Sequence, residues 1–281
     1  MQFSVLGPLV LTSEFASPVL KAAKPKQILA LLTIRANTIV SMHELIAEVW
    51  DEAPPVSAVT TIQSYVVQLR KLLATAANLT VPADAKRILS TEHNGYVLRI
   101  PNESLDLQRF MASARLGAQA LADGDDEGAA RQLREALDLW RGPALVDVPH
   151  GPLLSTHVTA MEQCRMSVLE QRVEADLRLG RHHALLTELT ALTADRPFNE
   201  NLAAKFMLAL YRSGQRWKAL SVYQELRHSL VEQLGLEPSL TLIRLQHAIL
   251  NSDPTLDSPP GNGKPWSTDE LMLALAQPTT G

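Results

Sequence analysis

The sequence predicts a mainly α-helical protein with a small β component, in which a winged helix-turn-helix is followed by a tetratricopeptide-like all-helical domain. Strand patterns open the chain, and three helical patterns and a hairpin pattern follow within the first 105 residues. After Leu105 only helical patterns occur. Within this second part, helix-ending glycines recur with a spacing of 34 residues, which is the period of tetratricopeptide repeats.

The first 20 residues are predicted to form short antiparallel strands joined by a turn. Apolar and polar residues alternate around Gly7-Pro8, a pair typical of turns. A first helix follows, in which Pro25 suits the first helical position and Asn37 suits the left-handed residue that ends it.

The second and third helices form the predicted helix-turn-helix. Ser41 and Glu44 have the spacing of a capping box, in which each residue satisfies a backbone N–H of the other. Prolines at 54–55 end the second helix, and Ser57 is placed to cap the third. The third helix carries one apolar stripe, formed by Val59, Ile62, Val66, Leu69 and Leu73.

The wing is predicted as a β-hairpin. After a loop at residues 75–87, two strand patterns within residues 88–100 flank Asn94-Gly95, the strongest short-range signal for a two-residue hairpin turn. Strands, three helices and a hairpin, in that order, are typical of winged helices in which β-strands precede the three helices.

The second part is predicted to contain seven amphipathic helices, at residues 106–122, 126–140, 153–179, 182–194, 199–213, 216–234 and 239–250. Gly180 and Gly214 lie 34 residues apart, and Gly124 begins a third copy of the same pattern. Ala219 follows Gly214 by five residues, where a small side chain lets paired helices approach closely. Trp140 is expected to fill the gap between its helix and the long helix that follows.

These patterns divide the chain into a winged-helix DNA-binding domain at residues 1–105, a helical domain at 106–250 and a flexible tail at 251–281. The tail has the Pro and Gly content of a linker up to residue 265. A capping box at residues 267–270 then precedes an apolar segment that is too short to form a stable isolated helix.

Composition indicates a globular protein of the cytoplasm. Hydrophobic residues make up 46% and charged residues 20%, which excludes a disordered or collagen-like chain. The single cysteine, Cys164, excludes an intramolecular disulfide, and we expect it to be a buried, inert thiol. Neither a secretory signal nor a membrane span is predicted.

Charge alone does not indicate a nucleic-acid-binding protein. Residues 1–105 carry 9 Lys and Arg against 8 Asp and Glu, a net charge of +1. The remainder carries 17 against 22, a net charge of −5. A DNA-binding function must therefore be argued from the pattern of particular residues.

The outer face of the third helix supplies that pattern. No Asp or Glu occurs between Ser57 and Leu79, whereas a helix face selected only for solubility carries both signs of charge. Such a face suits an anionic partner, and a glutamine such as Gln68 can contact a base edge with two hydrogen bonds. The candidate DNA contacts are Thr60, Ser64, Val67, Gln68 and Lys71 opposite the apolar stripe, and Thr61, Gln63, Tyr65 and Arg70 on its flanks. The alternative is an ordinary solvent-exposed helix.

Three further residues are candidates for contacts with the DNA backbone. Lys26 and Arg87 could pair with phosphates, although isolated surface cations are most often only solvated. The Tyr96 hydroxyl could contact a phosphate, but packing in the small core is the more common role for a tyrosine beside a turn.

The sequence contains no enzyme signature. No phosphate-binding loop or nucleophile elbow is present, and the histidines lack partners at metal-ligand spacing. We therefore expect no catalytic residue, no metal site and no cofactor.

Several motifs resemble those of the Streptomyces antibiotic regulatory proteins. In the first part these are Leu-Gly-Pro-Leu at 6–9, Pro-Lys-Gln at 25–27, Thr-Ile-Gln-Ser-Tyr-Val at 61–66, Leu-Arg-Lys-Leu-Leu at 69–73 and Gly-Tyr at 95–96. In the second part they are the segment 136–145, which contains Leu-Trp-Arg-Gly-Pro-Ala-Leu, and the segments 172–180, 208–214 and 234–238. The resemblance covers residues 3–250, and the last 31 residues fall outside it.

The resemblance implies an OmpR-like winged helix and a bacterial transcriptional activation domain. It also implies binding at direct repeats in double-stranded promoter DNA and recruitment of RNA polymerase to genes of antibiotic biosynthesis. The small net charge of residues 1–105 further predicts a homodimer on DNA, because one protomer delivers few cations to the phosphates. The chain differs from common family members at Val67 and Gln68, where basic residues are frequent, and in its Glu92-His-Asn-Gly-Tyr wing. Fewer cations mean fewer neutralised phosphates, which bears on affinity and on the operator sequence.

The predicted function is therefore a sequence-specific transcriptional activator. The alternative is a helical-repeat interaction protein whose winged helix does not bind DNA. The absence of acids from the third helix favours the activator.

Overall fold

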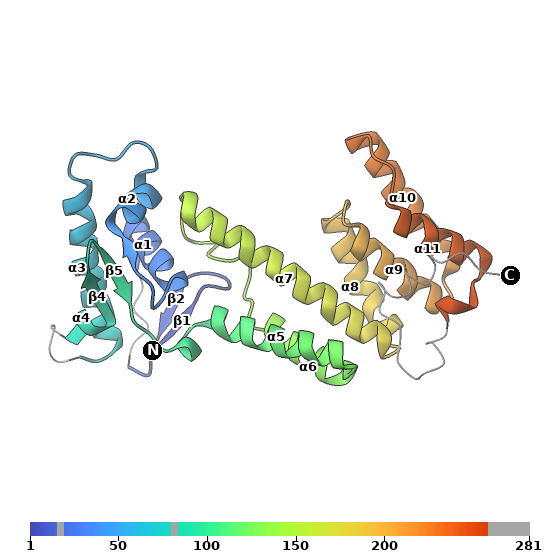
Figure 1. Ribbon diagram of the computed structural model, residues 1–281, viewed down its shortest axis with the longest axis horizontal. Coiled ribbons are helices and arrows are strands. Elements are labelled where there is room, and N and C mark those ends of the chain that lie inside the picture. The colour runs from blue at the N-terminus through green and yellow to red at the C-terminus, as the bar shows by residue number, and fades with distance from the viewer. Residues whose placement is uncertain (16–19, 80–83, 258–281) are drawn as a thin grey trace. The chain divides into compact units, whose positions relative to one another are not determined.

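The structure, a computed structural model, describes residues 1–15, 20–79 and 84–257. The chain divides into two compact units (Figure 1). The first comprises residues 1–115 and 135–167, and the second comprises residues 116–134 together with the described residues from 168 on. None of the described helices is long and apolar enough to cross a membrane.

The winged helix makes up most of the first unit. Its elements are β1 (Gln2–Ser4), β2 (Val10–Thr12), α1 (Ala23–Ile34), β3 (Val40–Ser41), α2 (Met42–Trp50), α3 (Ala58–Ala76), α4 (Ala85–Ile88), β4 (Leu89–Glu92) and β5 (Gly95–Leu98). β1 and β2 form an antiparallel hairpin, and the second sheet has the antiparallel order β3-β5-β4. The mainly helical winged-helix prediction is confirmed.

The helix ends of the winged helix lie close to where capping residues and prolines in the sequence predict them. The capping box of α2 is formed, with the Ser41 hydroxyl accepting from the Glu44 amide and the Glu44 carboxylate accepting from the Ser41 amide at 2.7 Å. Asn37 has the predicted left-handed conformation, with φ of 64°. α1 begins at Ala23, two residues before Pro25, so the proline lies inside the first turn, where its missing N–H is tolerated. Ser57 lies at the N-cap of α3, but its side chain makes no capping hydrogen bond.

The wing turn differs from the prediction by one residue. Glu92 pairs with Gly95, so the two turn residues are His93 and Asn94, and His93 has a positive φ of 51°. Gly95 is the first residue of β5, and a Cβ there would lie 2.4 Å from the carbonyl oxygen of Val40. The glycine is therefore required by the close approach of β3, a short strand that the sequence patterns do not predict.

Helices α1, α2 and α3 pack together over the apolar stripe of α3. Ile62, Val66, Leu69 and Leu73 are buried as predicted, and each such side chain stabilises the fold by about 1.5–3 kcal/mol. Val59 is 46% exposed, contrary to the prediction, because the neighbouring Ala58 occupies the inward position at the first turn.

The start of the helical half is divided between the two units, with residues 102–115 and 135–167 in the first and residues 116–134 and 168–178 in the second. η2 (Asn102–Ser104) precedes α5 (Asp106–Asp123), followed by α6 (Asp126–Leu137) and α7 (Pro152–Arg178). α6 ends at Leu137, three residues before the predicted end. Residues 138–151 instead run along the loop between β1 and β2: the Arg141 amide donates to the Leu6 carbonyl at 2.8 Å, and the Leu145 amide donates to the Gly7 carbonyl at 2.7 Å. The Leu-Gly-Pro-Leu and Trp-Arg-Gly-Pro-Ala-Leu motifs thus pack against each other.

Trp140 has the predicted core role. Its side chain is 8% exposed and contacts Phe110 edge to face, with ring centroids 5.5 Å apart. The guanidinium of Arg165 on α7 lies 4.6 Å from the Trp140 ring centroid. Cys164 is only half-buried rather than fully buried, and burial raises the pKa of its thiol, which disfavours the reactive thiolate.

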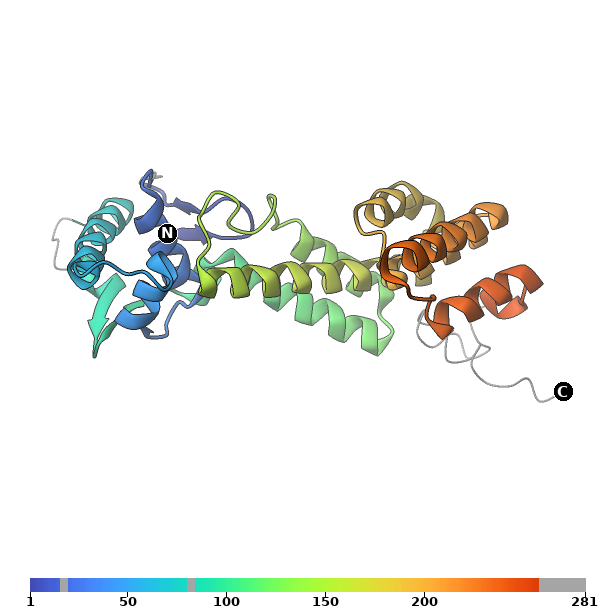
Figure 2. The same ribbon diagram turned by 90° about the horizontal axis from the view of Figure 1, so that it is seen from above.

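The second unit contains a stack of helices. α8 (His182–Asp195), α9 (Glu200–Arg212), α10 (Arg216–Leu234) and α11 (Leu240–Asn251) pack in succession, as Figure 2 shows, and η3 (Pro254–Leu256) follows. The repeat glycines Gly124, Gly180 and Gly214 all have positive φ, between 74° and 80°, and Ala219 is fully buried. Leu256 is also fully buried. The remainder of the predicted tail, with its capping box at 267–270, lies outside the described residues.

Candidate nucleic-acid interface

The outer face of α3 is exposed as the helical periodicity predicted. Thr60, Gln63, Ser64, Val67, Gln68 and Lys71 are exposed, while Thr61, Tyr65 and Arg70 are half-buried along its flanks. Val67 is 51% exposed, so this otherwise polar face also presents an apolar side chain. This set, hereafter the outer face of α3, is an acid-free surface that combines amide, hydroxyl, apolar and cationic groups.

The hydroxyl groups on this helix are partly occupied. Ser64 donates to the Thr60 carbonyl at 3.0 Å, and Thr61 donates to the Ser57 carbonyl at 2.9 Å. Their oxygens therefore remain as acceptors, whereas their protons are used within the helix. In the described part of the chain, no hydrogen bond engages the Gln68 amide, so both its donor and its acceptor are available to a base edge.

Arg70 connects α3 to the wing. Its Nε donates to the Leu89 carbonyl at 2.9 Å, and its Nη2 donates to the Thr91 hydroxyl at 2.8 Å. The guanidinium also lies 6.0 Å from the ring centroid of Tyr96. Burial lowers the pKa of Arg70 and raises the pKa of Tyr96. These contacts fix the angle between the helix and the hairpin, a role that the sequence patterns did not suggest for Arg70.

Tyr96 belongs to the core of the wing. It is 5% exposed and pairs with Val40 on one side and Thr91 on the other. Tyr96 therefore packs in the core of the free protein, which is the more common of the two roles considered for it. A contact of its hydroxyl with phosphate stays a prediction.

The acid in the wing is neutralised by a neighbour. The Glu92 carboxylate pairs with Arg99 and accepts from the Ser90 hydroxyl at 2.9 Å. The hydrogen bond from Arg99 lowers the pKa of Glu92, so the side chain is ionised but paired. The repulsion that an unpaired acid beside a phosphate would cause is thereby reduced.

The two candidate phosphate contacts outside α3 differ in availability. The Lys26 ammonium on α1 is paired with the Asp147 carboxylate, so it has a partner in the free protein. The side chain of Arg87 on α4 is 86% exposed, with Asp84 at 3.7 Å, and α4 packs against α3. Arg87 thus lies beside the helix that carries the candidate contacts, and its cation is accessible.

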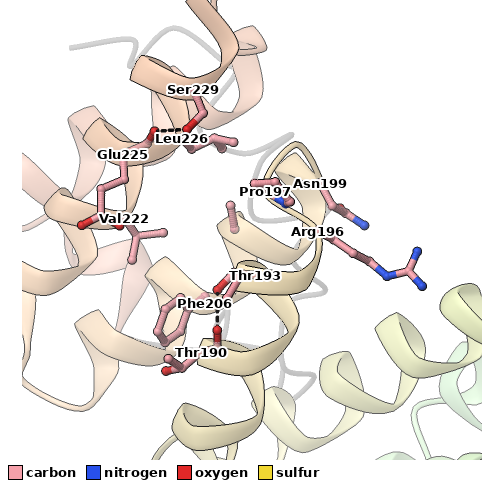
Figure 3. Close-up of a pocket in the computed structure, with 12 residues that line it drawn as sticks. Thr190, Thr193, Arg196, Pro197, Asn199, Phe206, Val222, Glu225, Leu226 and Ser229 are labelled. Carbon is pink, nitrogen blue, oxygen red and sulfur yellow. Dashed lines mark hydrogen bonds between the residues drawn. The ribbon is translucent and has the colours of Figure 1, made fainter. Parts of the chain in front are cut away.

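The second unit contains a cavity of about 310 Å³ between α8, α9 and α10 (Figure 3). Apolar Ala203, Phe206 and Leu226 line part of it. Its polar groups are largely used within the fold, because Thr193 donates to the Leu189 carbonyl at 2.8 Å and Ser229 donates to the Glu225 carbonyl at 3.0 Å. Ligand sites hold convergent polar groups that remain unpaired, so this cavity does not indicate a small-molecule site.

Comparison with known proteins identifies the family. Residues 105–250 match the bacterial transcriptional activator domain, and residues 17–98 match the domain described as transcriptional regulatory protein, C terminal. The regulatory protein DnrI of Streptomyces peucetius is 45% identical, over 92% of this chain and 94% of DnrI. The chain belongs to the Streptomyces antibiotic regulatory protein family of transcriptional activators.

Two further relatives are longer than this chain. The regulatory protein AfsR of Streptomyces griseus is 36% identical over 92% of this chain, but the alignment covers 25% of AfsR. A solved structure of Mycobacterium tuberculosis EmbR, in complex with a low-affinity phosphopeptide, matches with a TM-score of 0.84 and 33% identity. That match covers 98% of this chain and 69% of the EmbR chain. The two-part arrangement is therefore shared with regulators of transcription.

Proposed function

We propose that this family member binds double-stranded promoter DNA by placing α3 in the major groove. The observation that carries the proposal is the acid-free outer face of α3, opposite a well-buried apolar stripe. The major groove of B-DNA is about 12 Å wide, which admits one α-helix, and its base edges suit the amide of Gln68 and the apolar surface of Val67.

The flanking residues take supporting roles in this proposal. Thr60, Ser64 and Lys71 contact bases or phosphates, while Thr61, Gln63 and Tyr65 contact the sugar–phosphate backbone at the groove edges. Arg87 supplies a phosphate contact at the end of α3, and Arg70 with Tyr96 holds the wing. Lys26 contributes only if its pair with Asp147 opens.

The second part of the proposal concerns activation. We infer that the winged-helix segment 1–105 binds DNA, and that the segment 106–250 supplies the surface that meets RNA polymerase. Residues 106–250 carry 16 Lys and Arg against 18 Asp and Glu, a net charge of −2, so this segment has no excess of cations with which to hold DNA, whereas stacked helices offer an extended protein-binding surface. The genes controlled would belong to a secondary-metabolite biosynthetic cluster, and two protomers would occupy a direct repeat.

Footprinting on the regions upstream of neighbouring biosynthetic genes, followed by in vitro transcription from the protected promoters, tests the proposal. We expect protection of a direct repeat and stimulated transcription. A protein that protects no promoter fragment at low salt, yet is folded, would favour the alternative of an interaction protein with a winged helix that does not bind DNA.

A further inference from the structure

A carboxylate from the winged helix caps the first helix turn of α7. Glu48 lies near the end of α2 and is 1% exposed. Its Oε1 accepts from the Gly151 amide at 2.7 Å, and its Oε2 accepts from the amides of Leu153 and Leu154 at 2.9 and 3.0 Å. One side chain thus satisfies three backbone N–H groups more than 100 residues away.

The start of α7 cannot cap itself. The first N–H groups of a helix have no partner within it, and they are normally satisfied by a Ser, Thr, Asp or Asn at the N-cap. α7 begins at Pro152, which has no N–H, and the preceding residue is Gly151, which has no side chain. Glu48 therefore replaces the missing cap, and its negative charge lies at the positive end of the helix dipole.

The carboxylate is held from both sides. Gln27 on α1 donates from Nε2 to Glu48 Oε1 at 2.9 Å and to the Glu48 carbonyl at 2.7 Å. A Cβ at Gly151 would lie 2.0 Å from that same carbonyl oxygen, so the backbone of α2 and the start of α7 are in direct contact. This close backbone contact allows a single packing arrangement of α2 against the start of α7.

Glu48 links the helix that carries the candidate DNA contacts to α7. α2 packs against α3 and is joined to it by residues 51–57, so displacement of α2 displaces the helix that carries the candidate DNA contacts. α7 is in turn the helix that continues from the first compact unit into the second, which begins again at residue 168. A buried carboxylate bound to three directional donors specifies this alignment, whereas an apolar contact would permit sliding.

We propose that Glu48 is a positioning residue that transmits the position of DNA-bound α3 to α7. This inference rests on the proposed function. Loss of the carboxylate then separates DNA binding from activation, because α3 still fits the groove while α7 is no longer held in one orientation relative to it.

The test uses the full chain and three variants. Glu48→Gln keeps the shape but places an amide NH₂ against backbone donors. Gly151→Ala disturbs the same contact from the α7 side, because the added Cβ would clash with the Glu48 carbonyl, and it leaves the sequence of α2 unchanged. Glu44→Gln is the control, because Glu44 lies on α2 one turn away and, among the described residues, its carboxylate accepts hydrogen bonds from Ser41 and Arg35 of the winged helix. Promoter affinity is measured by gel shift, and transcription is measured at saturating protein.

We expect Glu48→Gln and Gly151→Ala to change promoter affinity by less than about threefold and to reduce maximal transcription by about tenfold or more. A fold defect alone would lower the active fraction and reduce both readouts together, as circular dichroism would reveal. Glu44→Gln should leave the ratio of transcription to promoter occupancy unchanged.

Two results would overturn the inference. One is an unchanged ratio of transcription to promoter occupancy in both Glu48→Gln and Gly151→Ala. The other is unfolding of both variants, since the contact would then serve only folding. Failure of the proposed function is distinguishable from either, because the wild-type protein itself would then bind no promoter.

Discussion

Gln68 and Lys71 lie on the same exposed strip of α3 but offer different chemistry to DNA. The glutamine amide presents a donor and an acceptor in fixed geometry, which can match one base pair and mismatch the others. The lysine ammonium is a point charge on a flexible chain, which suits any phosphate. In the proposed binding mode, Gln68 therefore contributes to sequence discrimination and Lys71 to general affinity.

We expect Gln68→Ala to cost about 1–3 kcal/mol on the preferred site and to relax discrimination at one base pair. Lys71→Ala should weaken all sequences similarly and lower the slope of log affinity against log salt by about 1. Gel shifts with single-base-pair operator variants at several salt concentrations measure both effects. An exposed glutamine on α5, changed as Gln119→Ala, should have no effect, and wild-type behaviour of both α3 variants would mean that another element reads the DNA.

Glu44 is a second residue whose contribution can be measured, through its dependence on pH. Burial would raise the pKa of Glu44, but hydrogen bonds from the Ser41 amide and hydroxyl and from Arg35 outweigh it and lower the pKa to about 2. The pKa of Glu44 is lower in the folded protein than the unfolded value of 4.5. The Glu44 carboxylate therefore stabilises the fold fully above pH 4.5, and this stabilisation is lost as the pH falls towards 2.

Glu44→Ala should accordingly lower the free energy of unfolding by about 1 kcal/mol at pH 7. The difference between wild type and variant should shrink as the pH is lowered from 4.5 towards 2. Denaturant titrations of both proteins at a series of pH values provide the measurement. A difference that stays constant through this range would show that the carboxylate charge is not what stabilises the cap.

Helices and strands were predicted correctly where the residues that determine their ends lie within or next to the element itself. The ends of α5, α7, α8, α9, α10 and α11 were predicted to within one residue, because caps, glycines and periodicity lie within the helix itself. β3 and the exact wing turn were missed, because Gly95 is dictated by a backbone oxygen that comes from residue 40. The early end of α6 likewise depends on contacts with residues 5–8, far away in the sequence.

The second unit contains an ion cluster that joins several helices. Asp176 on α7 is 2% exposed and pairs with three arginines: Arg134 on α6 at 3.1 Å, Arg172 on α7 at 3.3 Å and Arg181 before α8 at 2.9 Å. Because it is buried, Asp176 compensates cations that would otherwise lie against one another at the junction of α6, α7 and α8.

We therefore expect Asp176→Asn to destabilise the second unit by about 3–5 kcal/mol, the usual cost of breaking a buried pair from one side. Asp195→Asn is the matched control: its side chain is 75% exposed and lies 3.7 Å from Arg196, so it should cost no more than about 1 kcal/mol. Thermal unfolding followed by circular dichroism compares the two. Equal effects would show that the cluster does not stabilise the helix junction.

For the whole molecule, the sequence patterns predict a domain boundary near residue 105, whereas the two compact units of the structure have different boundaries. Residues 135–167 lie in the same unit as the winged helix. Asp106 accepts from the Val5 amide at 2.9 Å, and Asp147 accepts from the Leu9 amide at 2.8 Å. In the sequence these acids, like Glu48, look like ordinary solvated helix or loop residues, and their partners become evident only when distant segments meet.

A fragment ending at residue 105 should therefore be less stable than one ending at residue 167. The shorter fragment lacks the acceptors for the Val5 and Leu9 amides and the donors for Glu48, and hydrogen bonds to charged groups contribute about 1.5–3 kcal/mol each. Denaturant titrations of the two fragments measure the difference. Equal midpoints and slopes would mean that the winged helix folds independently of residues 106–167.

The winged-helix segment delivers few free cations for a DNA-binding domain. Residues 1–105 have a net charge of +1, and Lys26 and Arg99 are already paired with Asp147 and Glu92. The phosphate contribution to affinity scales with the cations delivered, so one protomer should bind weakly and two should bind cooperatively. Half-sites about 10–11 base pairs apart place both α3 helices on the same side of the duplex.

Inserting about half a helical turn between the half-sites rotates one site to the opposite side, and cooperative binding in gel shifts should be lost. An insertion of a full turn should restore the shared side and recover part of the cooperativity, while an affinity that is the same for all three spacings would show that the protomers bind independently.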